Sequence, residues 1–315
     1  MQATRSISAA HNGRSGTSSA SEGSLTQSVE RALSILSLFT DETPALRVAD
    51  ASARLGLGQS TVSRLLATLE ALGYVAKDDH TGRYRLGAEV IRLGGVALND
   101  NELRRQALAD LHDVSAATGL GANLSVLRRY GPADWGIFYL AHFDGAKAPR
   151  TYTLIGRRNP LHATAMGKVL LAHLPVDQRQ AILDVLPLPA YTPHTITARP
   201  ALEAELECVV RRGYAVECEE LAFGRACVAA PIRNRSGRVV AAMSLSGPLS
   251  AMRLLEREPE LARLAIECAD HISSRLGYVS APMLSASGGP SQQLNHSGRY
   301  TGHALRRPPQ EEPQP

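Results

Sequence analysis

Hydrophobic and polar positions between residues 46 and 87 follow the pattern of two short helices and a hairpin. The first helix is expected over residues 48–55 and the second from Gln59 onward, separated by a Gly-Leu-Gly break. Gly56 suits the end of the first helix, and Gly58 suits the N-cap of the second. The second helix gathers apolar side chains on one face, at Val62, Leu65, Leu66, Leu69 and Leu72. This order of elements predicts a winged helix-turn-helix.

The opposite face of the helix from Gln59 carries side chains that donate and accept hydrogen bonds. Short or forked polar groups of this kind reach base edges and phosphates when the front of a helix enters a major groove. We therefore expect this face to read DNA. The candidate residues on it are Gln59, Ser60, Thr61, Ser63, Arg64 and Thr68.

A turn-forming run at residues 78–82 separates two short strand patterns after this helix. In the second strand, Arg83 and Arg85 share one face, where they can meet phosphates or a minor groove. We expect Tyr84 and Leu86, on the other face, to point into the core. Residues 25–87 hold seven Lys/Arg and seven Asp/Glu, so attraction to DNA must come from where the charges lie. A winged helix that binds protein instead of DNA is the alternative.

Further helical patterns flank this unit. A helix near Thr26 is expected to pack behind the two-helix unit through Val29, Ala32, Leu33, Leu36 and Phe39. Residues 89–98 predict a linker helix with an apolar stripe at Val90, Leu93 and Ala97. Such a stripe fits a dimer contact, and packing onto the neighbouring domain explains it equally well.

From residue 122 onward, strand and helix patterns are mixed. Strands are expected at 124–127, 136–141, 214–217, 226–232 and 239–245, with a hairpin at Gly237. Helices are expected at 102–117, 164–173, 176–186, 201–212 and 260–276. Hairpins with helices grouped to one side predict an α+β sensor domain, in contrast to a doubly wound nucleotide binder.

Composition limits the class of protein. The 315 residues, 44% of them apolar, suggest about two domains, and a net charge of +4 makes the chain mildly basic. We expect disordered tails at 1–24 and 280–315, because neither can offset its ordering entropy. Between them we expect a DNA-binding domain at 25–87, a linker helix at 88–101 and a sensor domain at 102–279.

The sequence contains no apolar run of membrane-spanning length and no signal peptide pattern. Its four cysteines include no C-x-x-C pair, which fits a reducing cytoplasm. No histidine pairs with a cysteine or another histidine at the spacing of metal ligands. We therefore expect a cytoplasmic protein with no bound metal, no cofactor and no membrane partner.

Three parts of the second domain, joined to the winged helix, resemble the IclR family of bacterial transcription regulators. They are LHATAMGKVLLA at 161–172, the pair GYAVECEE at 213–220 and CVAAPI at 227–232, and AAMSLSGP at 241–248. The resemblance covers most of residues 25–279. It implies a GAF-like effector-binding domain and a homodimer or a homotetramer built as a dimer of dimers. It also implies binding to palindromic double-stranded DNA that a small metabolite modulates, acting as a repressor or an activator. Effectors in this family are often small carboxylates such as keto, sugar or aromatic acids, which points to a catabolic pathway.

Residue chemistry supports a polar effector site. Ser244 and Ser246 point to the same face of a strand and are candidate ligand anchors. The resemblance implies that Glu217 and Cys227 also contact the effector, with Glu217 standing where Asp is more usual. The N–H groups that begin the helix near residue 165 can donate to an anion. The effector-binding candidates are Ala165, Met166, Glu217, Cys227, Ser244 and Ser246.

Other polar residues near these motifs receive structural interpretations. His162 and Lys168 fit local caps or pairs, and Glu219 and Glu220 fit surface or interface contacts, as charge runs usually do. A rival hypothesis makes Cys227 a nucleophile, with His162 as its base and Glu217 as the orienter. The sequence contains no glycine elbow or oxyanion motif beside Cys227. We therefore expect no catalytic residues and no enzymatic activity.

Overall fold

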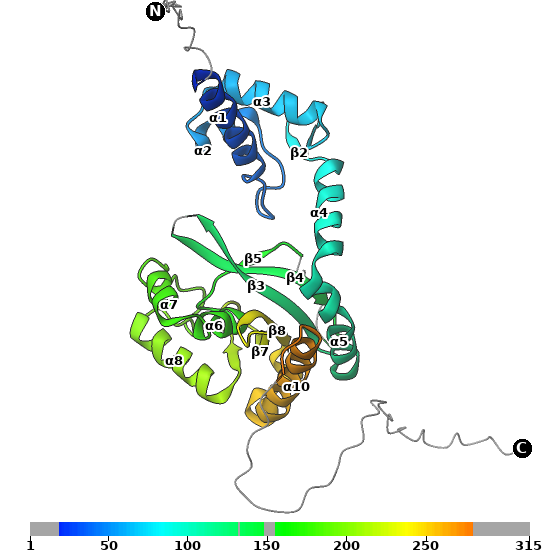
Figure 1. The fold of residues 1–315 in the computed structure, drawn as a ribbon, viewed down its shortest axis with the longest axis vertical. Helices are drawn as coiled ribbons and strands as arrows, with labels where there is room; N and C mark the ends of the chain where they lie inside the picture. Colours follow the sequence, from blue (N-terminus) through cyan, green and yellow to red (C-terminus); the bar gives the residue numbers. More distant parts are fainter. Residues whose placement is uncertain (1–18, 132, 148–154, 280–315) are drawn as a thin grey trace, which may run out of the picture. The chain divides into compact units, whose positions relative to one another are not determined.

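A computed structural model describes residues 19–131, 133–147 and 155–279 (Figure 1). The chain divides into a unit of residues 1–279 and a second unit, 280–315, which lies outside the described residues. The expectations for residues 1–18 and for the C-terminal tail also lie outside the described residues. In the described ranges, no helix is both long enough and apolar enough to span a bilayer.

The N-terminal elements pack around one small core. They are helices α1 (Ser19–Leu36), α2 (Val48–Leu55) and α3 (Gln59–Ala71), and the antiparallel hairpin of β1 (Val75–Lys77) and β2 (Tyr84–Leu86). Gly58 is the N-cap of α3, and Gly56 ends α2 with φ 64°, as predicted. The left-handed backbone at Gly56 carries no steric penalty, because glycine has no Cβ. The buried core consists of Ile35, Ala51, Val62, Leu66, Leu69, Val75 and Tyr84.

Several expectations about this domain are wrong in detail. Helix α1 begins at Ser19, upstream of Thr26 and within the expected N-terminal tail. Val29 and Leu33 on α1 are exposed, because the small domain covers one narrow stripe of this helix, the stripe centred on Ile35. Leu72 and Leu86 are also exposed, since they lie at the ends of α3 and β2, beyond the edge of the core.

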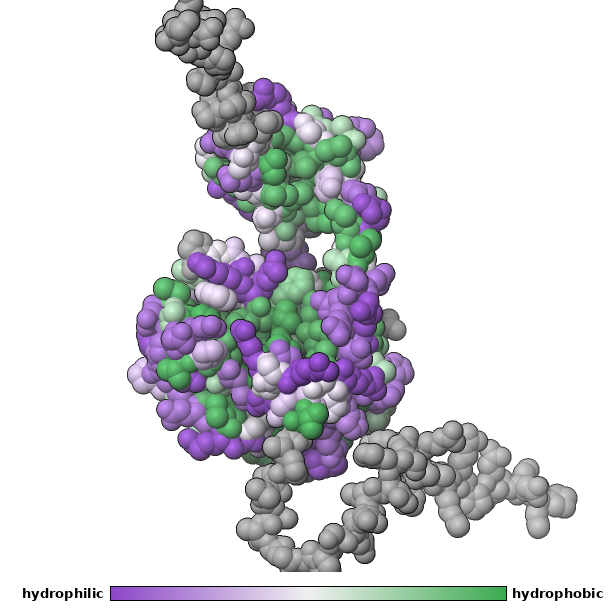
Figure 2. All heavy atoms as spheres, in the orientation of Figure 1, coloured by the Kyte–Doolittle hydropathy of each residue, from purple (hydrophilic) through white to green (hydrophobic). Residues whose placement is uncertain are grey.

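Helices α4 (Ala88–Asp100) and α5 (Glu102–Thr118) follow the wing. Among the described residues, no side chain of α4 is buried. Ile91, Leu93 and Val96 are exposed, and Figure 2 shows apolar residues at the surface along this segment. Within the described ranges, this helix therefore exposes several large apolar side chains.

The second part of the chain is built on an antiparallel sheet with the strand order β5-β4-β3-β8-β7-β6. Its strands are β3 (Gly121–Gly131), β4 (Asp134–Phe143), β5 (Arg158–Asn159), β6 (Ala215–Cys218), β7 (Arg225–Arg233) and β8 (Val239–Pro248). Strands β7 and β8 form the hairpin expected at Gly237, which has φ 77°. The mixed α+β fold agrees with the prediction.

Helices cover both faces of this sheet, so the expectation that they group to one side is wrong. Helices α5 and α10 (Leu254–Arg275) pack on one face, with the short helix α9 (Leu249–Met252) beside them. Helices α6 (Ala165–Ala172), α7 (Val176–Leu183) and α8 (Arg199–Arg212) pack on the other. Two covered faces are possible because successive residues of the central strands are buried on opposite sides, as Val228 and Ala229 are.

Candidate functional site

Helix α3 separates its side chains into a buried and an exposed face, as the sequence predicts. Val62, Leu66 and Leu69 are buried. Thr61 is half-buried, and the Thr68 hydroxyl donates to the Arg64 carbonyl oxygen (3.0 Å), which leaves its oxygen free to accept another bond. The exposed candidates on the polar face are Gln59, Ser60, Ser63, Arg64 and Thr68.

The hairpin beside α3 presents two exposed arginines. Arg83 and Arg85 flank Tyr84, which is buried in the domain core. The turn before them is held by the Asp78 carboxylate, whose Oδ1 accepts from the N–H groups of His80 (2.9 Å) and Thr81 (3.0 Å). A fixed turn holds the two guanidinium groups on one side of the hairpin, so they can form a small basic surface.

Four of the expected effector-binding residues lie together on one face of the large sheet. The strand register aligns Glu217, Cys227 and Ser246 in one row across β6, β7 and β8. Ser244 belongs to the next row, opposite Ala229. Neighbouring strands are about 4.8 Å apart, so these side chains line a compact area. All four residues are buried.

Helix α6 covers the same face and starts at the remaining two candidates, Ala165 and Met166. The Thr164 hydroxyl caps this helix by accepting from Gly167 N–H (3.1 Å), and the Thr164 carbonyl oxygen accepts from Lys168 N–H (3.0 Å). These bonds leave the N–H groups of Ala165 and Met166 as the donors of the first turn that can meet a bound anion.

Arg225, which the sequence reasoning missed, lies on the same sheet face two residues before Cys227. In the part of the chain that the structure describes, its guanidinium donates to Cys227 Sγ (Nη2–Sγ 3.4 Å) and pairs with no carboxylate. The pKa of Arg225 is raised by the adjacent Cys227 sulfur and, further away, by Glu217 and Tyr139. Most of its hydrogen-bond donors therefore remain available beside the serine row.

Asn123 was also missed, although it alternates with Leu124 in β3 as the serines alternate in β8. Its Nδ2 donates to Oγ of Ser244 (3.2 Å) and of Ser246 (3.1 Å). The next polar residue along β3, Ser125, donates to Met166 Sδ (3.2 Å) at the start of α6. Period-two alternation of polar residues in β3 was the signal that could have identified both.

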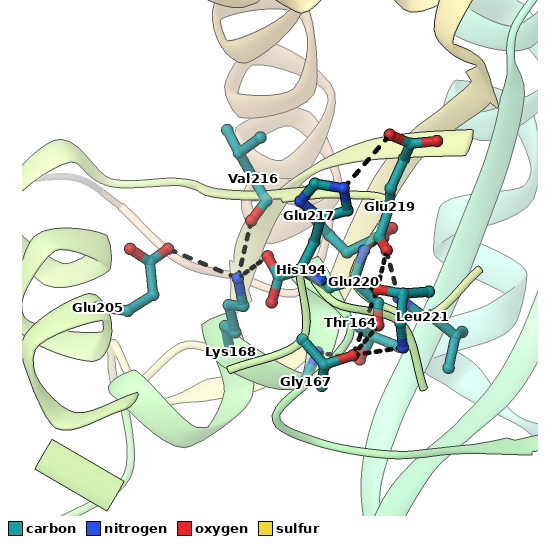
Figure 3. Close-up of polar contacts among 12 residues, drawn as sticks. Thr164, Gly167, Lys168, His194, Glu205, Val216, Glu217, Glu219, Glu220 and Leu221 are labelled. Atoms are coloured by element: carbon teal, nitrogen blue, oxygen red, sulfur yellow. Dashed lines mark hydrogen bonds and ion pairs between the residues drawn. The ribbon is translucent and has the colours of Figure 1, made fainter. Parts of the chain in front are cut away.

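The loop after β6 is held by buried charges (Figure 3). Lys168 of α6 donates from Nζ to the Val216 carbonyl oxygen (3.1 Å) and forms an ion pair with Glu220. A second carboxylate, Glu205 of α8, lies 3.8 Å from the same nitrogen. Glu220 is buried, which corrects the expectation of a surface contact, because the charge run at 217–220 folds inward onto this lysine. Lys168 therefore connects α6 to the loop that follows β6 through a hydrogen bond and an ion pair.

Glu217 shapes that loop with its carboxylate. Its Oε1 accepts from the N–H groups of Glu220 (2.8 Å) and Leu221 (3.3 Å). Glu219, which is half-buried, has φ 56°, a conformation that costs a residue with a side chain about 1 to 3 kcal/mol. Thr192 and Thr195 stabilise it by donating to the carbonyl oxygens of Glu219 and Glu220, both at 2.6 Å.

The geometry does not support a nucleophilic role for Cys227. Burial raises the pKa of the Cys227 thiol to about 12, so the reactive thiolate is absent near neutrality. The proposed base, His162, instead donates from Nε2 to the Pro189 carbonyl oxygen (3.0 Å). Among the described residues, no group of three or more His, Cys, Asp or Glu side chains could hold a metal ion.

Comparison with known proteins agrees with this architecture. Residues 28–79 match the family model described as the IclR helix-turn-helix domain, and residues 95–274 match the one described as bacterial transcriptional regulator IclR C-terminal. The chain is 39% identical over 221 residues to the HTH-type transcriptional regulator XynR of Escherichia coli (strain K12), covering 70% of this chain and 85% of that protein.

Solved structures of similar proteins share the fold. An IclR transcriptional regulator from Alicyclobacillus acidocaldarius superposes with a TM-score of 0.70 at 29% identity, covering 80% of this chain and 99% of that one. An IclR homolog from Microbacterium hydrocarbonoxydans, complexed with 4-hydroxybenzoate, gives a TM-score of 0.66 at 27% identity, covering 79% and 98%. The chain therefore belongs to the IclR family of DNA-binding bacterial transcription regulators and is not an enzyme.

Proposed function

We propose that this regulator responds to a small organic carboxylate that binds between the start of α6 and the polar rows of the sheet. The observation that carries the proposal is the Arg225 guanidinium, which lies beside Cys227 with most of its donors unfilled. A guanidinium binds a carboxylate through two parallel hydrogen bonds. The N–H groups of Ala165 and Met166 add donors of the same kind. The bound 4-hydroxybenzoate named for one structural relative is also a carboxylate.

The remaining contacts of this site follow from the same face of the sheet. Ser244 and Ser246 supply hydroxyl groups, and Cys227 supplies a small apolar wall. Glu217 bounds the site at β6, where its carboxylate is already engaged by the loop amides. We propose that it limits the size of the effector and does not bind it directly. The domain would then be a GAF-like sensor that spans residues 102–279.

We also propose that two copies of the chain bind a palindromic operator, each through the exposed face of α3 in a major groove. The six candidates on α3 would contact bases, and Arg83 and Arg85 would contact phosphates. The exposed apolar side chains of α4 support pairing with a second copy, because none of the residues of this helix is buried among those that the structure describes. Residues 25–87 would form the DNA-binding domain and 88–101 the linker. Because such a regulator acts on bacterial DNA, we propose a cytoplasmic location.

Effector binding would change operator affinity by favouring one arrangement of the paired recognition helices over another. A ligand shifts that equilibrium only if its affinities for the two states differ, however tightly it binds. Whether transcription rises or falls then depends on which state the carboxylate prefers.

The experiment is a thermal-shift measurement on the full chain with pyruvate, gluconate and 4-hydroxybenzoate as representative keto, sugar and aromatic acids. A ligand at a hundred times its dissociation constant adds about 2.7 kcal/mol of stability, which gives a measurable rise in Tm. Arg225→Met should abolish the rise, and Arg211→Met, which changes an exposed arginine on α8, should leave it unchanged. The proposal is wrong if wild type shows no rise with any acid, or if Arg225→Met responds as wild type does.

A further inference from the structure

A chain of hydrogen bonds crosses the sheet and ends on both serines of the proposed effector site. Oδ1 of Asp144 lies 2.8 Å from Nε2 of His142. Nδ1 of the same ring lies 2.8 Å from Oδ1 of Asn123. The amide nitrogen of Asn123 then donates to Oγ of Ser244 (3.2 Å) and Ser246 (3.1 Å). An exposed carboxylate is thus linked to two buried hydroxyl groups.

The orientation of the Asn123 amide follows from its burial. Both N–H bonds of a buried amide need acceptors, since a buried donor without a partner costs about 1 to 3 kcal/mol. The two serine oxygens provide one acceptor for each N–H. Rotating the amide by half a turn would place the nitrogen beside His142 Nδ1, which accepts a single bond, and would leave the second N–H without either serine oxygen as acceptor. The amide nitrogen therefore faces the serines.

This orientation determines the protonation of His142. Its Nδ1 faces a carbonyl oxygen of Asn123, and its Nε2 faces a carboxylate oxygen of Asp144. The carbonyl oxygen cannot donate, so Nδ1 must carry the proton of this bond. An Nδ1 that donates keeps the Asn123 oxygen toward the ring and the Asn123 nitrogen toward the serines.

We propose that His142 and Asp144 are positioning residues that set the hydrogen-bond polarity of the effector site. Because each serine oxygen accepts from Asn123, its own O–H is left to donate. Ser244 can donate into the site, and Ser246 has a competing acceptor in the Gly121 carbonyl oxygen at 3.5 Å, the limit of hydrogen bonding. The hydroxyl groups of the two serines therefore favour an effector group that only accepts hydrogen bonds, such as a carboxylate or ketone oxygen. They disfavour an amide nitrogen, which donates. This inference rests on the proposed effector site.

The proton on Nδ1 of His142 can be observed without any ligand. In full-length protein labelled with nitrogen-15 histidine, long-range proton–nitrogen correlation spectra distinguish the imidazolium from each neutral tautomer. His142→Gln assigns the signal by removing it, and the exposed His112 beside Asp113 serves as the comparison in the same sample. We expect a proton on Nδ1. A ring whose Nδ1 carries no proton overturns the proposal.

Selectivity is tested with three pairs of acid and amide: pyruvate and pyruvamide, gluconate and gluconamide, 4-hydroxybenzoate and 4-hydroxybenzamide. Calorimetry should show at least one acid binding wild type about tenfold or more tightly than its amide. Asn123→Asp replaces the donating nitrogen with an accepting oxygen and should remove that preference. Asn234→Asp, which changes an amide in the β7–β8 turn that works through its oxygen, should keep it.

The outcomes separate this inference from the proposed function. If an acid binds and Asn123→Asp, still folded by circular dichroism, keeps the wild-type preference, the polarity proposal fails and the effector site stands. If no acid binds wild type, the proposed effector class fails. The nitrogen-15 spectra still decide the state of His142 in that case.

Discussion

Among the charged residues that the structure describes, Lys168 and Glu217 are the most deeply buried, each with 1% of its surface exposed. We predict that Lys168→Met lowers the free energy of unfolding by about 3 to 5 kcal/mol, the range for removing one partner of a buried pair. Methionine nearly conserves the volume of the side chain, so the loss comes from charge and not from a cavity. The residue left behind is Glu220, a buried carboxylate whose Oε2 has no partner among the described residues even when the lysine is present.

The loss should depend on pH with a definite sign. Burial raises the pKa of Glu220, and Lys168 opposes that rise. Removing the lysine therefore raises the pKa further. A carboxyl whose pKa is higher in the folded state contributes stability that is fully present below its unfolded pKa and is lost as pH rises through its folded pKa. The deficit of Lys168→Met should thus be largest near neutral pH and above, and should shrink as pH falls towards the ordinary pKa of glutamate.

Urea unfolding at several pH values measures this effect, and Trp135, the single tryptophan of the chain, reports on β4 of the same domain. Adding Glu220→Gln to the variant removes both charges and should recover most of the deficit. Arg263→Met breaks an exposed ion pair with Glu267 (2.7 Å) and should cost less than about 1 kcal/mol. The reasoning is refuted if Lys168→Met costs no more than this control, or if its deficit grows as pH falls.

Three further predictions concern DNA, assembly and packing. Arg64→Ala should weaken binding of an operator duplex by about 1 to 3 kcal/mol in fluorescence anisotropy, and unchanged affinity would show that α3 reads DNA through another face. Ile91→Asp should shift sedimentation towards the monomer, whereas Val176→Asp, an exposed change on α7, should not; equal behaviour would exclude α4 as the contact. Gly167→Ala should lower the unfolding free energy by about 1 to 3 kcal/mol, because its Cβ would lie 2.2 Å from the Leu161 carbonyl oxygen. Gly94→Ala, where the added Cβ meets nothing within 4 Å, is the control, and an equal Tm for the two variants would contradict the argument.

Helix and strand boundaries were predicted best where glycine marks them. Gly56 and Gly58 fixed the ends of α2 and α3, and Gly237 identified the β7–β8 hairpin. The start of α10 was predicted too late because Pro259 reads as a stop signal. The helix in fact begins at Leu254 and tolerates the proline near its start, where the carbonyl left without a partner belongs to the fully exposed Leu255.

Some residues of the candidate site could be predicted from local sequence patterns, and others could not. Alternation alone placed Ser244 and Ser246 on one face, because strand periodicity is a local property. The pairing of Lys168 with Glu220 joins residues 52 positions apart, and no local pattern distinguishes a buried acid from a solvated one. Arg225 was missed since it stands at the first position of β7, where a basic residue reads as part of a turn.

Successive residues of β7 and β8 lie on opposite faces of the sheet and therefore have different roles. Positions 226, 228, 243 and 245 fill the core against α5 and α10, whereas 225, 227, 244 and 246 face α6. A codon library confined to the second set should yield folded variants with altered ligand preference, and the same library on the first set should yield insoluble protein. Residues that face α6 can then change more often in evolution than their neighbours in the core. A regulator with this fold can thus acquire a new effector while its core packing stays the same.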